Sequence, residues 1–206
     1  DRGSGKSLQA LAEITRAMNA SLNVEETLQA ALAGSARLIA SDSAQICLWE
    51  GERERLTPAA RSGPDAYVAA VHTPNNFYLP DQGYAGWIVR KRQPLLVPDA
   101  AVFRDVIPLI RPEDPPVRSY IGVPLSVRNR FIGTLEVTSA VPNVFGQDDE
   151  VLLTMIAEQA AVAIENARQY SVQAERVTEL SGLQKISQAI STLQDTHQLF
   201  AQLGQR

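Results

Sequence analysis

Few residues of this chain could do chemistry, and their surroundings argue against a catalytic or metal-binding site. Cys47 is the single cysteine, so a redox relay would lack its resolving thiol and a cysteine-based zinc site its other ligands. Cys47 lies between Ile46 and Leu48 in a strand-like stretch, which predicts a small buried side chain. His72 could ligate haem, but its polar loop predicts an exposed side chain, and haem ligation stays the minor alternative.

A catalytic site would also need a base beside a nucleophile. The sequence offers no such pair and no Gly-x-Ser-x-Gly elbow, so we expect a protein that is not an enzyme. What remains is a set of aromatic and polar residues that could line a small-molecule pocket: Trp49, Tyr78, Tyr84, Trp87, Asp99, Phe103, Ser119 and Tyr120.

Some of these candidates have a second explanation. Tyr84 and Trp87 lie three residues apart on a short predicted helix, so they share a face, and that face could equally belong to the core. Asp99 follows a predicted strand, where a carboxylate that caps a turn is as good an explanation as a ligand contact.

Composition excludes several classes of protein. The chain has 206 residues, 19 Lys and Arg against 23 Asp and Glu, and a net charge of −4. A nucleic-acid surface would show a basic excess, so we expect no nucleic-acid partner. No apolar run approaches the roughly 18–20 residues of a membrane span, so we expect no direct membrane contact. A lone thiol fits a reducing, cytoplasmic compartment.

Hydrophobic periodicity predicts helical ends and a strand-rich middle. A first helix is expected at 8–22 and a second from Asn23, whose side chain should cap it while Glu26 completes a capping box. The stretch 62–116 is rich in proline, which excludes long regular elements. The other predicted elements are strands at 45–50, 55–61, 94–98, 117–127 and 131–139 and a helix at 84–91.

The last third is a long predicted helix with an apolar residue at alternating steps of three and four. This heptad pattern is typical of helices that pair with another helix. Up to about Ala163, packing against the chain's own domain explains it as well; beyond Ala167, a partner helix explains it better. The residues of this seam are Leu153, Ile156, Ala160, Ala163, Ala167, Tyr170, Ala174 and Val177.

An internal repeat bears on the domain boundaries. Residues 8–32 can be laid on residues 180–203 with one single-residue gap, and both copies suggest a helix break, at Asn23 and at Gln194–Asp195. The sequence therefore predicts a linker and opening helix at 1–21, one whole domain at 22–166, and a signalling helix at 167–206 that runs into the truncated start of a second, similar domain.

Five motifs follow one another in a characteristic order. They are Leu22–Glu26 with Leu28; Gly83–Val89 followed by Gln93–Asp99; Arg118–Leu125; Phe131–Val137; and Phe145 with Asp149–Glu150. In this order the chain resembles the GAF domain family over about residues 22–166.

The resemblance implies an α+β fold. We expect an antiparallel sheet of about six strands, with helices on one face, ligand-pocket loops on the other, and long N- and C-terminal helices. It also implies a sensory module of a multidomain signalling protein, such as a histidine kinase of a two-component system or a cyclase. Such a module would bind an unidentified small molecule, form a homodimer through its N- and C-terminal helices, and relay its state through paired, coiled-coil exit helices.

Three features separate the alternatives. A GAF domain that only dimerises and spaces its neighbours should have filled its pocket, whereas a ligand-binding one should keep roughly 300 Å³ or more. Cyclic-nucleotide-binding members carry an Asn-Lys pair upstream of Phe-x-x-x-Asp-Glu; this chain has Phe145–Glu150 but Ser139-Ala140 in place of the pair. Covalent bilin attachment is not expected, because the stretch 111–117 has no cysteine.

Overall fold

The structure is a computed structural model that describes the backbone of residues 2–203 and the side chains of residues 9–182 and 184. The chain forms two compact units, of which the first ends at Ala167 and the second begins at Arg168. The elements are α1 (Arg2–Asn19), α2 (Val24–Leu38), β1 (Ser43–Glu50), η1 (Gly51–Arg53), β2 (Arg55–Ser62), α3 (Asp65–Ala69), η2 (Ala70–His72), α4 (Gly83–Lys91), β3 (Leu95–Val97), β4 (Ser119–Val127), β5 (Arg130–Ser139) and α5 (Gln147–Leu203).

The strands form one sheet in the order β2-β1-β5-β4-β3, with every neighbouring pair antiparallel. The α+β class is confirmed, but the sheet of the described residues has five strands where about six were expected. What could have been a sixth is a single bridge, in which Leu56 and Tyr78 exchange backbone hydrogen bonds of 2.8 and 2.9 Å. Pro74 and Pro80 flank Tyr78, and proline cannot donate to a sheet ladder.

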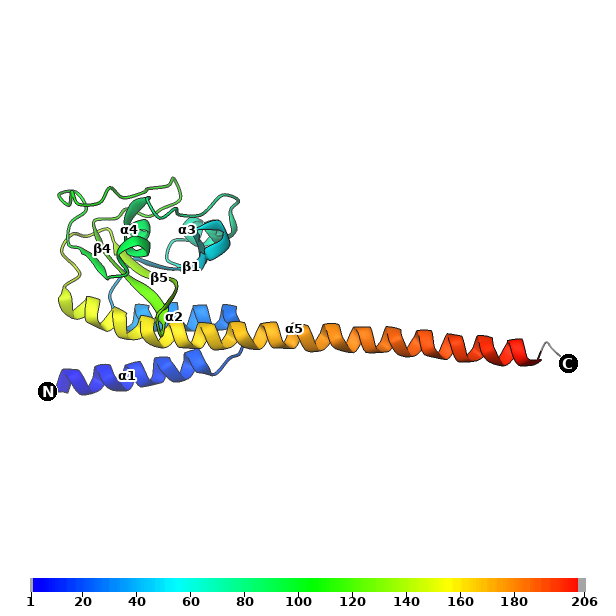
Figure 1. The fold of residues 1–206 in the computed structure, drawn as a ribbon. Coiled ribbons are helices and arrows are strands. Elements are labelled where there is room, and N and C mark those ends of the chain that lie inside the picture. Colours follow the sequence, from blue (N-terminus) through cyan, green and yellow to red (C-terminus); the bar gives the residue numbers. More distant parts are fainter. Residues whose placement is uncertain (1, 204–206) are drawn as a thin grey trace. The chain divides into compact units, whose positions relative to one another are not determined.

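The two faces of the sheet are covered differently. Within the first unit, α1, α2 and the start of α5 lie on one face, and α3, α4 and the loops on the other (Figure 1). An apolar core fills the space between the sheet and the long helices, with Ile46 and Leu135 from the strands against Leu153 and Ile156 from α5. Side chains alternate along a strand, so the neighbours of Ile46 on β1 and of Leu135 on β5 point to the opposite face of the sheet.

The start of α2 is held by a side-chain cap. Asn23 Oδ1 accepts the backbone N–H groups of Glu25 at 2.8 Å and Glu26 at 3.3 Å, as expected of a residue that caps a helix N-terminus. The other half of the expected capping box is different. The Asn23 amide donates to Ser21 Oγ at 2.9 Å, so Ser21 takes the part that was predicted for Glu26.

The predicted heptad seam of α5 divides at Ala167. Leu153, Ile156, Ala160, Ala163 and Ala167 are all buried within the first unit. These five residues therefore belong to the core of the first unit. Packing against the chain's own domain was one of the two explanations for this part of the heptad pattern. Farther along, Tyr170 is 51% exposed, Val177 is 64% exposed and Ala174 is exposed; a helix partner for these three stays a prediction.

The second predicted helix break is absent. The backbone is helical through Gln194 and Asp195 to Leu203, and the side chains of that segment lie outside the described residues. The truncated second domain stays a prediction. Among the residues that the structure describes, no helix is both long and apolar enough to cross a membrane.

Candidate functional site

A row of polar side chains lies on the sheet face that is turned away from α1, α2 and α5. Gln45 on β1 and Glu136 on β5 are opposite each other in the strand register. Ser43 and Thr138 extend the row by one step, with their hydroxyl oxygens 2.5 Å apart. Polar groups in a covered layer need hydrogen-bond partners, so this face is built differently from the apolar one.

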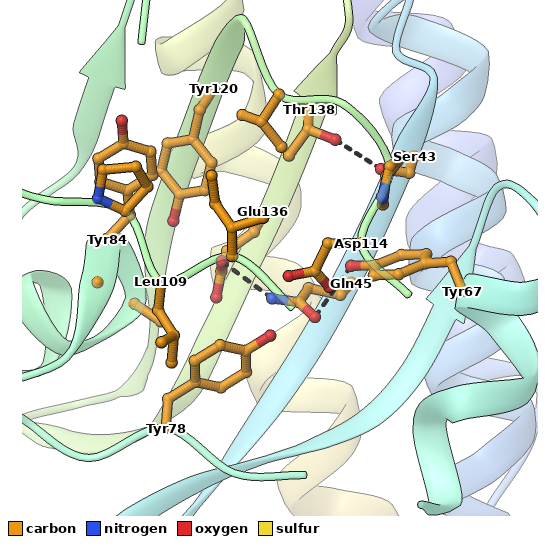
Figure 2. Close-up of a pocket in the computed structure, with 16 residues that line it drawn as sticks. Ser43, Gln45, Tyr67, Tyr78, Tyr84, Leu109, Asp114, Tyr120, Glu136 and Thr138 are labelled. Carbon is orange, nitrogen blue, oxygen red and sulfur yellow. Dashed lines mark hydrogen bonds between the residues drawn. The ribbon is translucent and has the colours of Figure 1, made fainter. Parts of the chain in front are cut away.

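A cavity of about 60 Å³ lies over the polar row, under α4 and the loop that precedes β4 (Figure 2). Gly83 at the start of α4 has φ +63°, and a Cβ there would lie 3.0 Å from the Leu109 backbone nitrogen. Glycine therefore lets the loop pack directly on the helix. The lining residues are Ser43, Gln45, Tyr67, Tyr78, Gly83, Tyr84, Ala85, Pro108, Leu109, Ile110, Asp114, Pro115, Val117, Tyr120, Glu136 and Thr138.

Glu136 is the buried carboxyl of this cavity, with 4% of its surface exposed. Gln45 Nε2 donates to its Oε2 at 3.1 Å, and Thr134 Oγ1 donates to its Oε1 at 2.6 Å. Burial raises the pKa of Glu136, and the hydrogen bonds from Thr134 and Gln45 offset only part of that rise. The carboxyl is therefore more readily protonated than an exposed glutamate, and a positive charge in the cavity would favour its ionised form.

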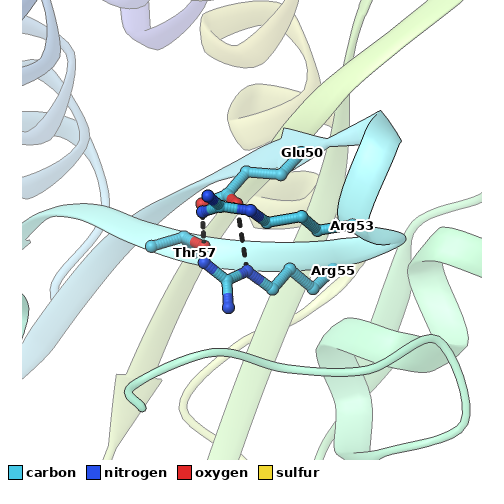
Figure 3. Close-up of polar contacts among 4 residues, drawn as sticks. All are labelled: Glu50, Arg53, Arg55 and Thr57. Atoms are coloured by element: carbon cyan, nitrogen blue, oxygen red, sulfur yellow. Dashed lines mark hydrogen bonds and ion pairs between the residues drawn. The ribbon is translucent and has the colours of Figure 1, made fainter. Parts of the chain in front are cut away.

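Glu50, at the far end of β1, has the opposite electrostatic environment (Figure 3). Thr57 Oγ1 donates to its Oε1 at 2.5 Å, while Arg55 and Arg53 donate to its Oε2 at 3.0 and 3.2 Å. The Thr57 hydrogen bond and then the two arginines lower the pKa of Glu50. This carboxylate is already partnered, and it does not line the cavity.

A buried arginine, Arg61, orients the Gln45 side chain of the polar row. Arg61 is 2% exposed; its Nε donates to Gln45 Oε1 at 3.3 Å, and its guanidinium lies 4.2 Å from the centroid of the Tyr67 ring. The Tyr67 hydroxyl donates to the same Gln45 oxygen at 3.0 Å. With its oxygen accepting two donors, Gln45 directs its amide nitrogen to Glu136.

Two polar atoms in the cavity wall have no hydrogen-bond partner, the hydroxyl of Tyr84 and Oδ1 of Asp114. Burial raises the pKa of both groups. Burial also raises the pKa of Tyr120, and the charge of Glu136 and a hydrogen bond to that carboxyl raise it further. A buried group without a partner costs roughly 1–3 kcal/mol, so the cavity holds hydrogen-bonding capacity that a ligand or water could use.

The structure brings three of the eight candidate pocket residues to this cavity, Tyr78, Tyr84 and Tyr120. The other five do not line it. Trp87 and Phe103 pack into the apolar cluster around Ile88, Trp49 meets Phe131 edge to face, and Ser119 is buried at the start of β4.

Asp99 is held in a turn. Its Oδ1 accepts Arg118 Nε at 2.9 Å and the Ala101 backbone N–H at 3.0 Å, and its Oδ2 accepts Arg118 Nη2 at 2.9 Å. Of the two explanations for this residue, the structure therefore supports turn capping.

The most polar residues of the cavity were missed in the sequence. Gln45, Glu136, Thr138 and Asp114 are absent from the candidates, although Glu136 and Thr138 carry a recognisable signal. Thr134, Glu136 and Thr138 alternate with apolar residues along β5, and an acidic residue at the centre of such a strand indicates a polar face. Asp114 lies in an irregular loop and carries no such signal.

The residues first considered for chemistry are placed as their sequence context predicts. Cys47 is fully buried on β1, and burial raises the pKa of its thiol, which disfavours the reactive thiolate. His72 is exposed at the end of η2. Within the described part of the chain, no group of three or more His, Cys, Asp or Glu residues is placed to hold a metal ion.

An antiparallel sheet with long helices on one face and a small polar cavity under loops on the other is the arrangement that the five motifs predict. A sequence model for the GAF domain matches residues 21–165, and the chain belongs to the GAF family. Its class is thus that of a sensory or regulatory module.

Solved structures share the fold at low sequence identity. The GAF domain of a phosphoenolpyruvate-protein phosphotransferase from Coxiella burnetii is 18% identical, with a TM-score of 0.70 over 81% of this chain and 96% of that one. Free methionine-R-sulfoxide reductase from Neisseria meningitidis, in complex with its substrate, is 21% identical, with a TM-score of 0.67 over 80% and 91%. Residues 122 to 287 of a methyl-accepting chemotaxis protein are 18% identical, with a TM-score of 0.62 over 76% and 98%. Identities this low show a common fold and no more.

Proposed function

We propose that this chain is a non-catalytic sensory module of a cytoplasmic signalling protein, of histidine kinase or cyclase type. It binds a small molecule in the cavity over Glu136 and relays occupancy through the start of α5 to a downstream output. The observation that carries the proposal is the buried polar row, whose cavity wall retains unpartnered hydrogen-bonding atoms. A purely structural layer would pair or remove such atoms.

The sheet itself supplies a path for the relay. Gln45 and Glu136 face the cavity, while their chain neighbours Ile46 and Leu135 belong to the core that includes Ile156 of α5. A shift of either strand that accompanies binding must therefore change the packing of α5, because interiors are close-packed. This makes α5 the natural output element.

The absence of catalysis is part of the proposal. One structural neighbour is a methionine sulfoxide reductase, so the fold permits redox chemistry. Here the single cysteine is fully buried between the sheet and α4, where it packs with Ala85 and Val89, and burial raises its pKa. A buried thiol without a second cysteine cannot complete a disulfide relay.

The cavity size favours a second candidate, a ligand-free domain that dimerises and spaces its neighbours. About 60 Å³ is well below the roughly 300 Å³ of typical ligand pockets. At about 10–15 Å³ per water-sized position, it accommodates only about four to six heavy atoms. A cyclic nucleotide, the third alternative, is far larger and would require the loop over the cavity to open.

Native mass spectrometry of freshly purified protein tests the proposal. We expect wild-type protein to carry a small extra mass that dissociates at raised collision energy. Ala85→Leu should lose that mass, because Ala85 lines the cavity and is 3% exposed, so that the larger side chain fills the space. Ala101→Leu is the matched control, since Ala101 is exposed and outside the cavity.

The control variant should retain the mass. Bare wild-type protein, or an extra mass that Ala85→Leu leaves unchanged, would contradict ligand binding in this cavity. The first of these results would favour the ligand-free scaffold.

A further inference from the structure

We propose that the ligand of this cavity is a small organic cation, an alkylammonium compound whose charged head lies between Glu136 and Asp114. This inference rests on the proposed function, because it names the chemical class that the same cavity would bind. It is carried by the charges of the lining, by the unpartnered atoms, and by the size and polarity of the space.

The charge of the cavity lining is one-sided. Glu136 and Asp114 are both lining residues, and none of the described lining residues is a lysine, arginine or histidine. None of the ion pairs found among the described residues involves either carboxyl. A cation that enters the cavity would therefore meet two carboxyl groups without a competing ammonium or guanidinium in the wall.

The nearby arginines are committed to neutral acceptors. Arg61 donates to Gln45, to the Tyr67 carbonyl oxygen at 3.2 Å, and at 3.5 Å to Asn76 and the Tyr78 hydroxyl. Arg111 donates to Asn76 Oδ1 at 2.8 Å and to a backbone carbonyl. The Arg111 backbone N–H donates to Asp114 Oδ2 at 2.8 Å. Burial raises the pKa of Asp114 and of Glu136; the charges of both arginines offset part of that rise for Asp114, and the charge of Arg61 does so for Glu136. Neither guanidinium forms an ion pair with these carboxyls, so Asp114 Oδ1 and Glu136 keep acceptor capacity for a ligand.

The unpartnered atoms fit a group with several donors. Asp114 Oδ1 can only accept when ionised, and the hydroxyl of Tyr84, a residue that is 6% exposed, can accept as well as donate. Glu136 oxygens each accept one hydrogen bond and have lone pairs to spare. An alkylammonium head has three N–H donors, whereas a carboxylate ligand would bring only further acceptors.

The rest of the cavity fits a short aliphatic tail. Leu109, Ile110 and Val117 line the side formed by the loop, and Figure 2 shows Leu109 on the opposite side of the space from Gln45 and Asp114. About four to six heavy atoms leave room for an amine with a short alkyl chain. The geometry therefore favours a compact amine over a large polar metabolite.

Three probes of similar chain length separate the ligand classes: n-butylammonium, 1-butanol and butyrate. Binding is followed by NMR through the side-chain amide of Gln45, which donates directly to Glu136. We expect butylammonium to bind about tenfold or more tightly than butanol, as for hydrogen bonds to a charged group, and butyrate to bind most weakly.

Variants assign the preference to the two carboxyls. Glu136→Gln should abolish the preference for the cation over the alcohol. Asp114→Asn, in a loop outside the sheet, should weaken it and serves as a second test should the buried substitution impair folding. Glu50→Gln is the matched control, because Glu50 is already paired with Arg53 and Arg55, and it should keep the preference.

Three results would overturn the inference. Butanol or butyrate binding as tightly as butylammonium would overturn the cation class and keep the proposed ligand site. A cation preference that survives both Glu136→Gln and Asp114→Asn would place the cation elsewhere. If none of the probes shifts the Gln45 amide, the cation class is wrong; bare protein in native mass spectrometry would then also reject the ligand site.

Discussion

Two glutamates of one sheet differ in their partners, and this difference defines the candidate site. Glu50 accepts hydrogen bonds from two arginines and a threonine, and its pKa is lowered. Glu136 accepts from an amide and a hydroxyl in a buried layer, and its pKa is raised. A neutral hydrogen-bond donor cannot compensate the loss of hydration as an ion pair does, so of these two glutamates it is Glu136 that retains the capacity to bind an added cation.

This contrast predicts a pH dependence of stability. Between the ordinary value of 4.5 and the raised pKa of Glu136, the folded state binds more protons than the unfolded state. The free energy of unfolding therefore falls as pH rises through that window. Glu136→Gln cannot ionise, so its stability relative to wild type should rise with pH above about 4.5. Urea unfolding at a series of pH values measures the difference.

Other groups that face Glu136 do not obscure this measurement. Cys47, Tyr67, Tyr78 and Tyr120 have pKa values raised by burial and stay neutral in that range. Asp114, whose pKa burial also raises, is present in both proteins, so its own titration contributes to both curves. Glu50→Gln is the control with the opposite sign, because a lowered pKa stabilises the fold above the window in which it titrates. Parallel curves for wild type and Glu136→Gln would show that Glu136 does not have a raised pKa.

At the scale of elements, local signals predicted the fold well. The helix at 84–91 and the long strands lie within a residue or two of their expected positions. Hydrophobic periodicity and helix capping depend on residues close together in the sequence, so they can be recognised without the tertiary structure. The five motifs together predicted the GAF fold. The differences depend on tertiary context. The expected sixth strand is a single bridge at Tyr78, and the first five residues of the heptad seam belong to the core, one of the two explanations that the sequence had left open.

The candidate site was predicted less well for the same reason. Most of the candidates chosen from the sequence were aromatic, and among those aromatic candidates the three tyrosines line the cavity. Trp49 and Trp87 bury large apolar surfaces elsewhere. Asp114 reaches the cavity because the loop folds over α4 beside Gly83, a non-local contact that no pattern along the chain reports.

The exposed part of the α5 seam makes an element-scale prediction. Val177 follows the spacing of Tyr170 and Ala174, whereas Val172 lies off that face; both valines are exposed, at 64% and 47%. Because a charge would have to enter an apolar helix pair, Val177→Glu should weaken self-association at least about tenfold, as expected for losing the burial of a valine. Val172→Glu is the matched control.

Analytical ultracentrifugation over a range of concentrations measures this change. A dimer that both substitutions leave intact, or a wild-type monomer at all concentrations, would remove residues 170–177 from any helix-pairing interface.

At the scale of the whole molecule, the sheet separates two functions. One face carries the polar cavity, and the other packs on α1, α2 and the start of α5. Alternation along β1 and β5 places cavity residues and core residues on the same strands, so that binding on one face is mechanically linked to packing on the other. The central claim of a sensory module is that α5 responds to occupancy of the cavity.

Hydrogen–deuterium exchange of the segment 150–167 tests that claim most directly. We predict that n-butylammonium, at a concentration at which the Gln45 amide signal is saturated, slows exchange in this segment several-fold, because an occupied cavity stabilises the sheet against which α5 packs. Butyrate should have no such effect, and Ala85→Leu should not respond to either compound. Unchanged exchange in 150–167 while butylammonium occupies the cavity would contradict a relay from the cavity to α5.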